Sequence, residues 1–504
     1  MDESGKVLMG LMERRALEAA FRELAETTNY AQQVARAEAI AQHGNAALPV
    51  LLAMLDTEDP QLRGGLGQVA ARLERTLVAP ALRLAARARE RSEAARLTAL
   101  TILDRYLHEA PDSELLSALQ DPRAMARQSL RELMLEMERS EFAVAEYLTQ
   151  LAEQPPDVPD MLLAAIPEMP PHEHLVTLLR MFAQGQKPIA AQKALDLLGR
   201  TRMPAAAQAL AALTHTLPPG QAALAERNLR KLRLSGVAVT PSSAAGWRAL
   251  LSPVDGSGAQ VIWFVKAEED NAPGKLFGVL AQDPAGIVLG FGSQSTPMKD
   301  LPPARPIGSQ HAVPQAEGLP PLVLLEASFE AGRRAVRDAL ELHWAAKTTP
   351  PLEYQLLNPL IWSAAPCSAA SEPELAPAST AHTAALLDHP AFASWFWYSA
   401  DLQETARQLG RRHDAAARRA QVIAIADAQF GPEVVASYRR RLAAMTRWLA
   451  LAGQPEAAAL AQAVSEQLAL APAAESPFVR RLIGNGIDLA LSNQRRRLDG
   501  KTKR

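Results

Sequence analysis

Apolar residues recur at α-helical spacing through the first half of the chain, and the helices they predict repeat at a fixed interval. Pro49, Pro80 and Pro111 stand 31 residues apart, and Pro204 falls three periods further along. Each opens an apolar stretch, because proline is tolerated in a first helical turn, where its missing N–H would have no partner. A period of about 30 residues is typical of stacked helix pairs. Residues 1–236 are therefore predicted to form an array of helical hairpins.

The second helix of each predicted hairpin has its own pattern. A small or apolar residue followed by arginine recurs at Arg63, Arg96 and Arg127. The dipeptides Asp59-Pro60 and Asp121-Pro122 suit the turn between two helices, because Asp caps the coming helix and Pro opens it.

Residues 47–70 hold the pattern in full: an apolar first helix, a short acidic turn and an arginine early in the second helix. In this order the segment resembles a HEAT repeat, and the resemblance covers about residues 30–235, or roughly six units. It implies an α-solenoid whose concave face binds an extended partner. It also implies that the recurring arginines pair with the acids of the inter-helix turns.

The composition changes near residue 236, after which Gly, Pro, Val and aromatic residues become more frequent. Alternating apolar residues and turn signals predict strands at 247–251, 260–266, 275–281 and 322–326. An amphipathic helix is predicted at 328–346. Residues 237–363 are therefore interpreted as a small α+β module, a mostly antiparallel sheet with one helix packed on it.

The last part of the chain is predicted to be helical again. Residues 364–382 have the Ala, Pro and Ser content of a linker, and residues 493–504 are interpreted as a disordered basic tail. Between them, residues 383–492 form a bundle or degenerate repeats, with helices near 383–388, 391–409, 412–429, 432–452, 455–470 and 476–491. The predicted fold class is mainly α: a HEAT-like α-solenoid, a small α+β module and a C-terminal helical region.

Composition and charge limit the function. The net charge of −2 gives no global field that favours nucleic acid or a membrane. The single cysteine, Cys367, permits no disulfide within the chain, and neither a secretory signal nor a spanning apolar run is recognised. We therefore expect a cytoplasmic protein without a membrane partner.

One candidate interaction site is aromatic. Trp395, Trp397 and Tyr398 belong to a run of four aromatic residues on the helix predicted at 391–409. Trp and Tyr are favoured anchors of protein interfaces, so the run predicts either an interaction site or burial, with the β module as a possible partner.

A second candidate is basic. Residues 380–504 carry 17 basic and 11 acidic residues, and the basic ones cluster, as at Arg439, Arg440 and Arg441. The clusters predict either a phosphate-contacting surface or solvated helix faces that pair with acids elsewhere.

Other patterns favour structural roles. Asp255–Gly258 lacks the Gly-Lys-Ser/Thr of a phosphate loop and predicts a hairpin turn. His172 and His174 stand two apart, so they do not share a helix face and indicate a helix start rather than a metal site. Asp283 and Phe291, with Trp263 and Arg305, are either groove residues or ordinary loop and core residues. No catalytic, cofactor-binding or metal-binding residue is predicted.

The first hypothesis is a non-catalytic scaffold that binds an unidentified protein partner and needs no cofactor. The second is nucleic-acid binding through the arginine-rich C-terminal helices. HEAT-like folds include DNA glycosylases, but the slightly acidic repeat region does not favour that use. The third is an enzyme with a site between the β module and the helices, where Asp255, Asp283 or Glu326 lies beside Arg333 or Arg334.

Overall fold

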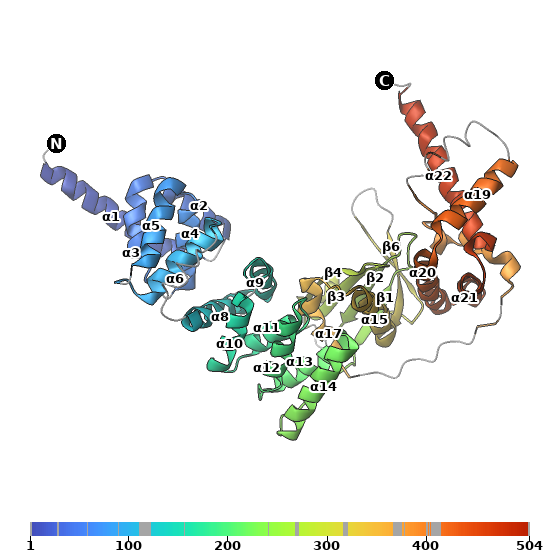
Figure 1. Ribbon diagram of the computed structural model, residues 1–504, viewed down its shortest axis with the longest axis horizontal. Helices are drawn as coiled ribbons and strands as arrows, with labels where there is room; N and C mark the ends of the chain where they lie inside the picture. The colour runs from blue at the N-terminus through green and yellow to red at the C-terminus, as the bar shows by residue number, and fades with distance from the viewer. Residues whose placement is uncertain are drawn as a thin grey trace. The chain divides into compact units, whose positions relative to one another are not determined.

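The chain is mainly helical with one antiparallel sheet (Figure 1). The computed structural model describes residues 3–27, 30–57, 59–88, 90–109, 122–155, 157–239, 241–267, 272–315, 321–365, 375–376, 378–399, 402, 404 and 415–501. They divide into two compact units, residues 1–143 with 147–170 and residues 144–146 with 171–504. Within the described ranges, no helix combines the length and apolar character needed to cross a membrane.

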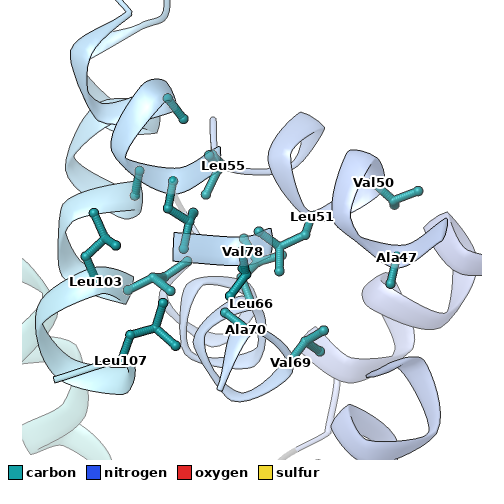
Figure 2. Packing of buried hydrophobic residues seen from close by; sticks show 14 of the residues in the cluster. Ala47, Val50, Leu51, Leu55, Leu66, Val69, Ala70, Val78, Leu103 and Leu107 are labelled. Atoms are coloured by element: carbon teal, nitrogen blue, oxygen red, sulfur yellow. The ribbon is translucent and has the colours of Figure 1, made fainter. Parts of the chain in front are cut away.

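The first unit is helical, and its helices within residues 3–106 contribute to one apolar core. Its helices are α1 (Glu3–Ala25), α2 (Tyr30–Ala41), α3 (Ala47–Ala53), α4 (Pro60–Ala70), α5 (Arg75–Arg87), α6 (Glu93–Thr101), η2 (Ile102–Tyr106), α8 (Pro122–Arg139), α9 (Ala143–Ala152, part of which is assigned to the second unit) and α10 (Asp157–Ala165). Figure 2 shows Leu51, Leu66, Val78 and Leu103 meeting in this core. Gly67 lets α4 approach η2 closely, since a methyl group there would lie 2.3 Å from the Tyr106 ring.

The periodic prolines open helices in only some of the predicted places. Pro204 is the first residue of α13, and Pro60 is the first of α4, where Asp59 accepts a hydrogen bond from the Gln61 N–H at 2.9 Å. Pro80, in contrast, lies inside α5. The helix begins a turn earlier because Val78 and Ala79 are buried, and this burial outweighs the preference of proline for a first turn. Pro111 lies outside the described residues, and Pro49 is the third residue of α3.

Each recurring arginine has a partner among the described residues that is not a turn acid. Arg63 pairs with Glu132 of α8, and Arg127 pairs with Glu168. Arg96 donates from Nε to the Ala86 carbonyl at 3.0 Å. The expected pairing with Asp59 is therefore wrong, because that carboxylate caps α4; Asp121 lies outside the described residues.

Two helical hairpins begin the second unit. They are α11 (Glu173–Ala183) with α12 (Pro188–Leu198), and α13 (Pro204–Thr216) with α14 (Pro219–Leu234). α11 lies against α13, and α12 lies against α14, so the hairpins stack in two layers. Their inner faces are Ala and Leu, and the small alanines allow close packing.

The sheet of the second unit is antiparallel throughout, in the order β4-β3-β2-β1-β6-β5. Its strands are β1 (Trp247–Leu251), β2 (Ala259–Lys266), β3 (Gly274–Gln282), β4 (Gly286–Thr296), β5 (Gln310–Val313) and β6 (Leu322–Ser328). The four predicted strands and the antiparallel arrangement are confirmed. β4 and β5 were not predicted, because β4 is glycine-rich and β5 has only four residues.

Short helices cover one face of the sheet. The predicted helix is confirmed as α15 (Phe329–Ala346), whose N-cap Ser328 accepts from the Ala331 N–H at 3.2 Å. Gly332 brings α15 close to Ala249 and Phe264, and α16 (Leu352–Leu357) lies against β4. α17 (Pro359–Trp362) follows and contacts α13.

The C-terminal part holds α19 (Ala415–Gln429), α20 (Pro432–Leu451), α21 (Pro455–Leu470) and α22 (Pro477–Lys501), after the 3₁₀ turns η5 (Thr380–Asp388) and η6 (Pro390–Phe392). Two predictions are wrong here. No helix covers residues 393–399, whose backbone is irregular, because Trp395 and Trp397 bind different neighbours. The tail is not irregular from residue 493, because α22 continues to Lys501.

Candidate interaction surface

The aromatic run is largely internal. Trp395 is 1% exposed, and its Nε1 donates to the Val254 carbonyl before β2 at 2.9 Å. Trp397 is half-buried and donates from Nε1 to Gln429 Oε1 at 2.6 Å. Tyr398 is 66% exposed. The two tryptophans therefore hold the C-terminal helices together and to the β module, and only Tyr398 faces solvent.

The three consecutive arginines also bind within the chain. Asp283, at the end of the β3–β4 hairpin, accepts from Arg440 Nε at 2.9 Å through Oδ1 and from Arg441 Nε at 3.0 Å through Oδ2. Arg441 also donates to the carbonyls of Gly256 and Asp283, each at 3.0 Å. Arg439 donates from Nε to the Ser465 carbonyl at 3.2 Å. These contacts fix α20 against the sheet and α21.

Other arginines of the C-terminal helices have acidic partners as well. Arg418 pairs with Asp488 at 2.8 Å, Arg447 pairs with Asp338, and Arg481 pairs with Asp388. Arg411 and Arg412 lie outside the described residues. The geometry of the described arginines matches the interpretation in which clustered basic residues pair with acids elsewhere.

The carboxylates considered for an enzyme do not meet Arg333 or Arg334. Glu326 is buried between Arg248, at 2.9 Å, and His311, at 2.7 Å. Asp255 organises the turn before β2 by accepting from the N–H groups of Ser257 and Ala259. This confirms the predicted turn.

The remaining candidates are structural too. His172 is the N-cap of α11, as predicted, and its Nδ1 accepts from the His174 N–H at 3.2 Å. Trp263 and Phe291 touch edge to face, whereas Arg305 donates to the Gln310 carbonyl. Among the described residues, no three His, Cys, Asp or Glu side chains are placed to hold a metal. Cys367 lies outside those residues.

A cluster that sequence reasoning missed joins α13, α15 and α17. The His215 ring stacks on Trp362 with a centroid distance of 5.6 Å, and the guanidinium groups of Arg333 and Arg337 lie 4.8 and 5.1 Å from the centre of the Trp362 ring. Burial, together with these two arginines, lowers the pKa of His215 to about 4. The His215 side chain is therefore neutral at pH 7.

This cluster predicts acid sensitivity of the second unit. Unfolded His215 takes up a proton near pH 6.5, whereas the folded residue resists protonation until about pH 4. Its contribution to the stability of the folded state is therefore lost as the pH falls from about 6.5 to about 4. We expect the free energy of unfolding to fall by on the order of 1–2 kcal/mol between pH 7 and pH 4.5, a value that allows for the partial exposure of His215. Denaturation followed by tryptophan fluorescence measures it. His215→Gln should remove this part of the pH dependence, and an unchanged dependence contradicts the assignment.

One strongly charged surface is exposed to solvent in the second unit. We call it the α12–α14 surface. On and beside α12 it exposes Lys187, Lys193, Arg200 and Arg202. On α14 it exposes Arg227, Arg230, Lys231 and Arg233. Glu226 is the exposed acid and pairs with Arg230 at 2.9 Å.

Helix packing brings the two halves of this surface together. The Asn228 side chain lies against Gly199 and donates to the Leu195 carbonyl at 2.9 Å. Arg200 and Arg227 flank that contact in the sequence, and Lys231 donates to Asn228 Oδ1 at 3.3 Å. The helices therefore gather their charges into one patch.

Charge counts over long segments concealed this surface. Residues 187–236 carry eight Lys or Arg and two acids, but the acidic repeats before them cancel this excess when residues 1–236 are counted together. A shorter counting window finds it.

Comparison with known proteins adds no assignment: no protein-family model, curated protein or solved structure matches the chain.

Proposed function

We propose that this protein is a non-catalytic scaffold that binds other proteins through a solvent-exposed surface of a HEAT-like array of helical hairpins. The observation that carries the proposal is the α12–α14 surface. Eight exposed cations stand there beside two exposed aliphatic side chains, Ile189 and Leu234, which are 69% and 86% exposed. Cations beside exposed aliphatic side chains suit a partner that carries acidic and apolar side chains.

The architecture supports the same function. The apolar faces of α11 to α14 are buried where these helices pack against one another. Their solvent-exposed faces are therefore left for a partner, as in stacked-helix proteins. In the described C-terminal helices, by contrast, five of the arginines that a nucleic-acid interface would use bind Asp283, Asp338, Asp388 or Asp488.

Cross-linking in lysate of the source cells tests the proposal. The purified full-length protein is incubated with lysate, with and without nuclease treatment, and an amine-reactive cross-linker, and cross-linked peptides are mapped by mass spectrometry. We expect links from other proteins at Lys187, Lys193 and Lys231. Exposed or half-exposed lysines elsewhere, such as Lys299 and Lys347, are the internal control.

Two results oppose the proposal. Partner links confined to the control lysines would remove the α12–α14 surface from the function. Association that disappears with nuclease treatment would indicate nucleic acid instead of protein.

A further inference from the structure

We propose that the α12–α14 surface binds an acidic, amphipathic segment of another protein, an inference that rests on the function proposed above. The juxtaposition that carries it is a group of exposed basic side chains on and beside α12 and on α14, with one exposed aliphatic side chain in the first turn of α12 and another at the end of α14.

The charge of the surface selects an acidic partner. Residues 187–236 have a net charge of +6, and the Lys and Arg side chains of this segment are exposed. Most of these charges lie within a few residues of the Gly199–Asn228 contact, so their fields add over a distance comparable to the Debye length of about 8 Å. An anionic segment is attracted there, and a cationic one is repelled.

The aliphatic residues select amphipathic character. On α12, Ile189 stands four residues before Lys193, which places these two side chains along one face, and Arg200 follows just after the helix ends at Leu198. On α14, Leu234 follows Arg227 by seven residues and Arg230 by four, so it continues the same row. A partner that buries both Ile189 and Leu234 must therefore carry apolar side chains as well as acidic ones.

The same residues favour protein over single-stranded nucleic acid. Single-stranded nucleic acid is held by aromatic side chains on which bases stack. The α12 and α14 helices contain no Phe, Trp or Tyr, and Ile and Leu offer no stacking surface. Aliphatic side chains beside cations instead match the Glu- or Asp-rich face and apolar face of an amphipathic segment.

Binding by purified full-length protein tests the inference. The probes are a short fluorescent peptide with Glu on one helical face and Leu on the other, the same peptide with Ser in place of Leu, and single-stranded and duplex DNA. Fluorescence anisotropy is measured at low and physiological salt. We expect the Glu/Leu peptide to bind several-fold more tightly than the Glu/Ser peptide.

Two surface variants locate the binding. Arg200→Glu with Arg227→Glu should weaken the Glu/Leu peptide by about tenfold or more. Ile189→Ser with Leu234→Ser should weaken it several-fold and leave the Glu/Ser peptide unchanged. Arg15→Glu with Arg419→Glu is the matched control, because it changes the net charge equally at exposed arginines of α1 and α19. Circular dichroism and tryptophan fluorescence verify that each variant is folded.

The outcomes separate this inference from the proposed function. DNA bound more tightly than the Glu/Leu peptide, with no effect of the Ile189 and Leu234 changes, overturns both. Peptide binding that the matched control weakens equally, or no peptide binding at all, overturns the acidic-partner assignment. The scaffold function still stands in that case if other proteins cross-link at Lys187, Lys193 or Lys231.

Discussion

Replacing Arg180 with alanine should destabilise the second unit by about 3–5 kcal/mol, the largest effect that we expect from a single substitution. This guanidinium is 5% exposed, and burial lowers its pKa to about 10, so it stays charged at pH 7. It donates to the Leu356 carbonyl at 2.9 Å, to the Gln355 carbonyl and to Asn358 Oδ1 at 3.3 Å.

The reason for the size of this effect is the end of α16. The last carbonyls of a helix have no N–H partner within the helix and carry partial negative charge. Arg180 of α11 satisfies two of them and so joins the helical hairpins to the α+β module. Alanine leaves these acceptors buried without their donor and also leaves a cavity.

Chemical denaturation followed by tryptophan fluorescence measures the change in stability. All seven tryptophans lie in the second unit, so the signal reports on that unit. Arg202→Ala is the control, because Arg202 is exposed in the neighbouring loop and should change stability by less than about 0.5 kcal/mol. Equal effects of the two substitutions contradict the role assigned to Arg180.

Replacing Asp283 with alanine should cost about 2–4 kcal/mol and release the C-terminal helices from the sheet. The Asp283 side chain is 10% exposed, and it binds Arg441, which is 12% exposed, and Arg440, which is 43% exposed. Its loss leaves the Arg441 charge nearly buried, with two carbonyls and the Tyr438 ring as its remaining partners. Most of the stability lost in the Asp283→Ala variant therefore comes from the unpaired charge of Arg441.

A double-mutant cycle identifies the pair as the cause. If Asp283 and Arg441 act together, Asp283→Ala and Arg441→Ala combined should cost at least about 1 kcal/mol less than the sum of the single changes. Hydrogen exchange should also increase in α20 of the Asp283→Ala variant. Asp427→Ala, at an exposed acid of α19, is the control. If the stability losses of the two single variants add up, and hydrogen exchange in α20 stays the same, Asp283 does not attach α20 to the sheet through Arg441.

Local sequence signals predicted the secondary structure wherever one short stretch settles it. Asp59 caps and Pro60 opens α4 as the pattern indicates, and β1 begins and ends at the predicted residues. The signal failed for β4. Its glycines lower strand propensity, and it is a strand because Gly290 and Gly292 allow Tyr354 and Leu276 to approach its backbone.

By itself, the sequence determined a mainly helical chain with an antiparallel sheet between helical parts, because periodicity and caps act over a few residues. Only the tertiary structure decided what the candidate side chains do. Arg441 meets an acid 158 positions away in the chain, and Trp395 meets a carbonyl 141 positions away. The exposed cations of α12 and α14 form one surface because Asn228 packs on Gly199. Charges act through space, so their pairing, and hence their availability to a partner, follows from packing and not from neighbourhood in the chain.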